Sequence, residues 1–141
     1  LEFRRVLFRS YRLVRNVKKV YPISKEINQA IIETYEYLQT LPNEKARQKH
    51  LKRVEKGLKE QYTARMKKLS FAQGKLLIKL IDRQSNSTSY ELVKAFMGPF
   101  KAGFYQTFAA LFGASLKKEY DPLGEDKLTE RVVLLVENGQ I

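Results

Sequence analysis

Residues 70–84 read Ser-Phe-Ala-Gln-Gly-Lys-Leu-Leu-Ile-Lys-Leu-Ile-Asp-Arg-Gln, and this pattern predicts a helix that is buried on most of its circumference. Ser70 suits the cap position, because its hydroxyl can accept a hydrogen bond from a free N–H of the first turn. The apolar residues recur at helical spacing and leave one narrow polar stripe: Lys75, Lys79 and Arg83. Such a helix needs partners on several sides, so we predict that the other helices pack around it.

Two helical patterns precede this stretch. The first covers residues 11–41 and contains Pro22, which removes a helical hydrogen bond and restricts the residue before it. We therefore expect either one kinked helix or two helices that meet near residues 21–24. The second runs from Asn43, a plausible cap, to about Leu69, and every third or fourth residue is apolar.

Two further patterns follow. Residues 88–91 (Thr-Ser-Tyr-Glu) match a capping box and open a Phe-rich helix that Gly98-Pro99 interrupts. The last helix spans about 126–138, with Gly139 as its C-cap residue. Its predicted inner face consists of Leu128, Val132, Leu135 and Val136.

These patterns together predict an all-α fold. We expect a single compact domain of five or six helices. In it, a long N-terminal helical hairpin packs on the buried central helix and on the kinked, Phe-rich helix.

The first ten residues, Leu-Glu-Phe-Arg-Arg-Val-Leu-Phe-Arg-Ser, resemble translated linker sequence, and Glu-Phe is what an EcoRI-type restriction site encodes. We interpret residues 1–10 as a non-native segment and give them no functional weight. The predicted domain is then 11–141, an N-terminally truncated fragment, because the chain does not begin with Met.

The composition excludes several kinds of site. There is no Cys among the 141 residues, so the chain has no disulfide, thiolate nucleophile or Cys-based metal site. The single His50 lies among lysines and arginines, a poor place to bind a cation. Residues 1–68 hold 18 Lys and Arg against 7 Asp and Glu, so they carry +11 of the net charge of +12.

A candidate polar site lies at the end of the central helix. Asp82 sits in the last turn, where the helix dipole disfavours an anion, and Arg83 and Gln84 follow it. An acidic turn later in the chain supplies possible partners: Glu119, Tyr120 and Asp121. Two interpretations stay open. We favour a structural ion pair that fixes the next loop; the alternative is a solvent-connected site for acid–base chemistry.

A basic face follows the second helix, with lysines spaced by three or four residues: Lys45, Lys49, Lys52, Lys56 and Lys59. Such a stripe could contact a phosphate backbone or an anionic membrane. No phosphate-binding loop, zinc-finger spacing or RNA-binding aromatic motif accompanies it. We favour a solvated helix face.

Phenylalanine recurs at every fourth residue between positions 96 and 112. We favour core packing over an apolar ligand groove, and we do not expect a membrane span, because Pro99, Gln106 and Thr107 interrupt the apolar run at 95–116. The loose spacing of the acidic residues between 119 and 126 also argues against a calcium loop. We expect no metal and no cofactor.

Four segments in this order carry a family resemblance: Ile-Glu-Thr-Tyr-Glu-Tyr-Leu (32–38), Gly-Lys-Leu-Leu-Ile-Lys-Leu-Ile-Asp-Arg (74–83), Ser-Tyr-Glu-Leu-Val-Lys-Ala-Phe (89–96) and Ser-Leu-Lys-Lys-Glu-Tyr-Asp-Pro (115–122). The chain resembles the bacterial domain-of-unknown-function 4294 family from about residue 11 to its end. The resemblance carries over no functional residues. It implies an extracytoplasmic protein of the periplasm or cell envelope, because members begin with a secretion-signal-like segment.

Three hypotheses of function follow. The first is a non-catalytic envelope module, with a binding or structural role, whose partner is a protein, a peptide or an apolar ligand. The second is an enzyme that uses Asp82 and Arg83 with the region around Glu119 and Asp121. The third is electrostatic binding of nucleic acid or anionic lipid through the five lysines. We favour the first, because no catalytic constellation is recognisable and a periplasmic location makes nucleic acid an unlikely partner.

Overall fold

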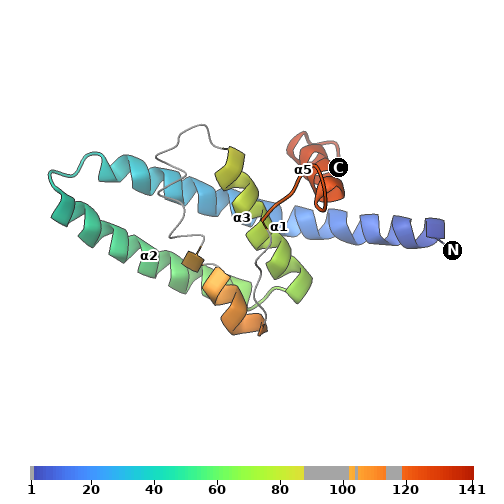
Figure 1. The fold of residues 1–141 in the computed structure, drawn as a ribbon, viewed down its shortest axis with the longest axis horizontal. Helices are drawn as coiled ribbons and strands as arrows, with labels where there is room; N and C mark the ends of the chain where they lie inside the picture. The colour runs from blue at the N-terminus through green and yellow to red at the C-terminus, as the bar shows by residue number, and fades with distance from the viewer. Residues whose placement is uncertain (1, 88–101, 104, 114–118) are drawn as a thin grey trace.

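The computed structural model describes residues 2–87, 102–103, 105–113 and 119–141, and all regular structure in these ranges is helical. The helices are α1 (Glu2–Leu38), α2 (Glu44–Met66), α3 (Phe71–Ser87) and α5 (Lys127–Glu137). Between α3 and α5 lies a further helical stretch, residues 102–103 and 105–112, which we call the Phe108 helix. The prediction of an all-α fold is confirmed, and Figure 1 shows α2 returning alongside α1 as the second arm of a hairpin.

Helix α1 is continuous through Pro22, so the alternative of two separate helices is wrong. The proline ring is exposed, while the neighbouring Tyr21, Ile23 and Ser24 are buried. Ser24 Oγ donates a hydrogen bond of 2.7 Å to the carbonyl of Tyr21 within the same turn. Helix α1 also runs through most of residues 1–10, the segment interpreted as non-native.

Helix α3 lies at the centre of the core, as predicted. Its start is a reciprocal capping box: the N–H of Gln73 donates to Ser70 Oγ at 3.2 Å, and the N–H of Ser70 donates to Gln73 Oε1 at 3.1 Å. Residues 76–78 and 80–82 are all buried. The principal partner of α3 is α1, and the side chain of Gln73 also reaches Asn16 on α1 at 3.2 Å.

Helix α2 contributes its predicted apolar seam to the same core. Leu58, Tyr62 and Met66 are buried, and Leu51 and Val54 are half-buried against them. Asn43 caps the helix by accepting a hydrogen bond of 2.9 Å from the N–H of Ala46. The opposite face of α2 is therefore left to solvent.

The Phe108 helix packs on the start of α3 through aromatic rings. The ring of Phe108 lies 5.5 Å from that of Phe71 and 4.9 Å from that of Phe112, centroid to centroid. Phe108 is fully buried, whereas Phe71, predicted on the covered face of α3, is 49% exposed because it begins the helix at the edge of the core. Phe96, Phe100, Phe104, the predicted kink at Pro99 and the capping box at 88–91 lie outside the described residues.

Helix α5 packs on α1, and its C-terminus is closed as predicted. Gly139 has a φ of +67°, the N–H of Gln140 donates to the carbonyl of Leu135, and the N–H of Gly139 donates to that of Val136. This is a Schellman motif. The predicted inner face needs correction: Val132 and Val133 are the buried pair, whereas Leu128 is 48% exposed. Leu128 lies in the first turn, before α5 reaches the core.

None of the helices in the described ranges combines enough length and apolar character to cross a lipid bilayer.

Candidate functional site

The end of α3 and the segment 119–137 meet through charged side chains, which we call the C-terminal clasp. Its members on α3 are Lys79, Asp82 and Arg83, and its members on the later segment are Tyr120, Asp126, Glu130 and Glu137. The two groups lie 38–54 residues apart in the sequence, so only the fold brings them together.

Asp82 is the buried anchor of the clasp. Its side chain is 1% exposed, and Oδ2 accepts hydrogen bonds from the backbone N–H of Tyr120 at 2.8 Å and from Asn86 Nδ2 at 3.3 Å. The carboxylate thus fixes the position at which the chain returns to α3. These contacts are hydrogen bonds, whereas the ion pairs at this end of α3 join Lys79 to Asp126 and Arg83 to Glu130 rather than to Asp82, the residue for which we favoured an ion pair.

Lys79 and Asp126 form a buried ion pair, with Nζ and Oδ1 2.7 Å apart. The other carboxylate oxygen of Asp126 accepts the N–H of Asp121 at 2.9 Å, and the N–H of Asp126 donates to the carbonyl of Asp121 at 2.9 Å. Asp126 therefore closes the turn at 121–126 and pairs with α3 at the same time. The predicted solvated stripe of α3 is wrong at Lys79, which lies beneath this turn and is not exposed to water.

Arg83 binds Glu130 in a bidentate manner. Nε lies 2.7 Å from Oε1 and Nη2 lies 3.0 Å from Oε2, while Nη1 reaches Glu137 at 3.0 Å. The hydrogen bond to Arg83 holds the pKa of the Glu130 carboxyl below its usual value of 4.5. Tyr120 completes the group by donating its hydroxyl to Glu130 Oε1 at 3.1 Å.

Two buried tyrosines beside the clasp are held in their neutral form. Burial and the interaction with Glu137 raise the pKa of Tyr21 to about 12. Burial and the charge of Glu130 raise the pKa of Tyr120 above its usual range. Neither hydroxyl is therefore prepared to act as a base near neutral pH.

The predicted polar site is assembled only in part. Asp82, Arg83 and Tyr120 meet as described, and Asp121 joins through its main-chain N–H and carbonyl while its side chain is exposed. Glu119 is exposed at the surface. Gln84 lines a groove with Tyr21 and Glu137.

Burial of Asp82 bears on what the site can do. The acid–base hypothesis requires its carboxylate to meet a substrate or a solvent-connected pocket. The side chain is instead almost fully covered, and the cations next to it in the sequence pair with other carboxylates. This geometry favours a structural role.

Sequence reasoning missed Lys79, Asp126, Glu130 and Glu137 as members of the cluster. A signal for them was present: Asp126, Glu130 and Glu137 are spaced by four and seven residues and so share one helix face. Lys79 and Arg83 show the same spacing of four. Two matched stripes of opposite charge indicate a contact between two helices.

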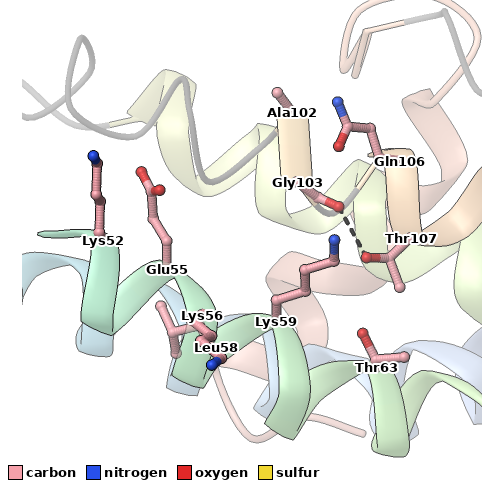
Figure 2. Close-up of a pocket in the computed structure, with 10 residues that line it drawn as sticks. All are labelled: Lys52, Glu55, Lys56, Leu58, Lys59, Thr63, Ala102, Gly103, Gln106 and Thr107. Atoms are coloured by element: carbon pink, nitrogen blue, oxygen red, sulfur yellow. Dashed lines mark hydrogen bonds between the residues drawn. The ribbon is translucent and has the colours of Figure 1, made fainter.

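The five lysines of the basic face are all exposed on α2, as predicted. None of them forms an ion pair with another of the described residues. Three of them line a groove of about 400 Å³ between α2 and the Phe108 helix, which we call the α2 groove. Figure 2 shows Lys52, Glu55 and Lys59 on the same side of α2, with Lys59 extending toward the helix that carries Gly103 and Thr107.

The walls of the α2 groove differ in character. The α2 wall carries Lys52, Glu55, Lys56, Leu58, Lys59 and Thr63. The residues that the structure describes on the facing wall are all uncharged: Ala102, Gly103, Gln106 and Thr107. The Thr107 hydroxyl donates to the carbonyl of Gly103 at 2.9 Å, so it is already engaged within its own helix. Among the described residues, the charged side chains of the groove therefore all come from α2.

Metal ligation finds no support in the described part of the chain, where no three His, Asp or Glu side chains converge in a metal-binding arrangement. His50 instead stacks on Tyr37, with the ring centroids 4.5 Å apart.

Comparison with known proteins gives one match. A family model described as "Domain of unknown function (DUF4294)" matches residues 6–135, nearly the whole chain. No curated protein and no solved structure matches the chain.

Proposed function

This chain belongs to the DUF4294 family, whose description names no activity, and we propose that it is a non-catalytic helical binding module of the bacterial cell envelope. The charged groups of the chain lie partly in the buried C-terminal clasp and partly on the exposed face of α2.

One observation carries the proposal. Asp82 and Arg83, the central residues of the candidate acid–base site, are engaged in the C-terminal clasp, where they hold α3 to the segment 119–137. The five lysines of the basic face are exposed, and three of them line the α2 groove. Charged groups that are exposed beside a groove support recognition of a partner, whereas the clasp supports stability.

The envelope location is part of the proposal and rests on the resemblance to proteins with secretion-signal-like segments. Fractionation of a bacterium that expresses an epitope-tagged full-length natural protein tests it. We expect the tag in the periplasmic or envelope fraction, and recovery in the cytosol alone would contradict the location.

Binding is tested by charge reversal on immobilised protein. The triple variant K52E/K56E/K59E removes the cations of the α2 groove, and K18E/K19E/K127E makes the same change of charge on exposed lysines of α1 and α5. We expect envelope components that the unmodified protein retains to be lost by the first variant and kept by the second. Equal retention by both variants would contradict a role for the groove.

An enzyme screen provides the complementary measurement. Turnover that is lost in Asp82→Asn, while folding is kept, would replace the binding proposal by the acid–base hypothesis.

A further inference from the structure

We propose that the α2 groove binds a polypeptide segment of mixed charge, in which two acidic side chains flank a basic one. This inference rests on the proposed function, because it names the class of partner that the binding module takes.

The charge order along the α2 wall carries the inference. Lys52, Glu55 and Lys59 follow one another at steps of three and four residues, so they lie in one row on the helix with the acid between two cations. Lys56 also lines the groove, but its side chain points away from this row (Figure 2). Figure 2 shows the three side chains of the row on the same side of α2, with Lys59 extending toward the facing wall. The complementary ligand presents an acid, a base and an acid in the same order.

A polypeptide is the macromolecule that supplies both signs of charge at this spacing. A phosphate backbone or an anionic lipid surface presents anions alone. The carboxylate of Glu55, in the centre of the row, would repel these anions. A membrane would also contact a projecting surface, whereas these residues line a recess between two helices.

The facing wall gives the groove room for the ligand. A Cβ atom built on Gly103 would meet no atom of the described residues within 4 Å, so these residues leave the space beside it open. Leu58 supplies a buried apolar side chain between the charged residues of α2. The ligand would therefore pack an apolar side chain against Leu58 and place its main chain near Gly103.

The glycines of the chain allow a steric test that leaves every charge unchanged. Gly103→Met adds a long side chain at a residue that lines the α2 groove, and its Cβ would meet no atom of the described residues within 4 Å. Gly57→Met is the matched control, because a Cβ there also meets nothing within 4 Å, yet Gly57 does not line the groove. Circular dichroism confirms that both variants keep the helix content of the unmodified protein.

The probe is an array of synthetic peptides of about 12 residues that contain Glu and Lys in all orders, and fluorescence anisotropy measures affinity for the best binders. We expect enrichment of the acid–base–acid order. Because one obstructed central contact typically costs tenfold or more in affinity, we expect a loss of about tenfold with Gly103→Met and no loss with Gly57→Met. Enrichment of no order, or equal binding by both variants, would overturn the inference.

Glu55→Lys separates the alternative partners by the sign of its effect. For the mixed-charge peptide, reversing this charge weakens binding. For a single-stranded oligonucleotide or for phosphatidylglycerol vesicles, it strengthens binding. Preference of the unmodified protein for either anionic probe over the peptides, together with strengthening by Glu55→Lys, would overturn the inference while leaving a binding function in place.

Discussion

At the scale of single residues, the buried Lys79–Asp126 pair has the largest expected effect on stability. Removing one partner leaves an unpaired buried charge, which typically costs about 3–5 kcal/mol. We expect Lys79→Met to lower the free energy of unfolding by about that amount in urea denaturation, and Lys127→Met, on an exposed lysine, to change it by less than about 0.5 kcal/mol.

A double-mutant cycle isolates the pair. Asn at position 126 keeps an acceptor for the N–H of Asp121 and removes the charge. We expect Lys79→Met and Asp126→Asn to destabilise less together than the sum of their separate effects. Additive effects would show that the two charges are not coupled.

The lowered pKa of Glu130 predicts how the free energy of unfolding depends on pH. Its pKa in the folded protein is held below 4.5 by Arg83, so the unfolded chain takes up a proton first as the pH falls. The stabilisation is complete above pH 4.5 and is lost as the pH falls through the lower pKa of the folded state. We expect Glu130→Gln to flatten this part of the stability curve, measured by urea denaturation between about pH 6 and pH 2.5. The control Glu60→Gln, on the exposed face of α2, should leave the curve unchanged.

At the scale of elements, the contact between α3 and the Phe108 helix depends on Gly74. A Cβ built there would lie 2.8 Å from Cε2 of Phe112, so a larger residue must displace the ring. Ala normally stabilises a helix interior by about 0.5–1 kcal/mol relative to Gly. At Gly74 we expect displacement of the ring to outweigh that gain, with a net loss of about 1–2 kcal/mol.

The matched glycine is Gly57 in α2, where an added Cβ meets nothing within 4 Å. We expect Gly57→Ala to raise the free energy of unfolding by about 0.5–1 kcal/mol, the ordinary gain in helix propensity. Thermal and urea unfolding of the two alanine variants measure the contrast. Stabilisation by both would contradict the tight contact at Gly74.

The elements also show what the sequence allowed us to predict. Local features were predicted: Asn43 and Ser70 cap their helices, Gly139 closes α5, and the apolar seam of α2 is buried. Each of these depends on residues only a few positions apart. The pairing of Lys79 with Asp126 was not predicted, because a polar stripe on one helix looks the same whether water or another charged helix covers it.

Two other predictions differ from the structure, one at the start of a helix and one within a helix. Phe71 follows the apolar spacing of α3, but it lies in the first turn, where neighbouring side chains cover it only in part. Pro22 appeared able to divide α1, yet the helix continues because packing of the surrounding residues on α3 and α5 holds it. Spacing alone does not report where a neighbouring helix ends.

At the scale of the whole molecule, the positive charge is concentrated in α1 and α2. Residues 1–68 carry +11, and repulsion among exposed cations opposes compaction. Because salt screens exposed charges more strongly than buried pairs, we expect the melting temperature to rise between about 20 mM and about 300 mM NaCl. The variant K45Q/K49Q should show a smaller rise. A fall in melting temperature with salt would mean that surface attraction exceeds repulsion.

The clasp has a consequence for how α5 docks. Lys79 pairs with Asp126 and Arg83 with Glu130, so a step of four residues on α3 matches a step of four on the later segment. Sliding α5 by one turn in the direction that brings Asp126 opposite Arg83 would leave Lys79 opposite Pro122. The buried Lys79 would then lack its anion, at a cost that apolar packing does not impose. We expect the two ion pairs to fix the register of α5 along α3. Apolar packing of Val132 and Val133 alone would not distinguish this register from one shifted by a helical turn.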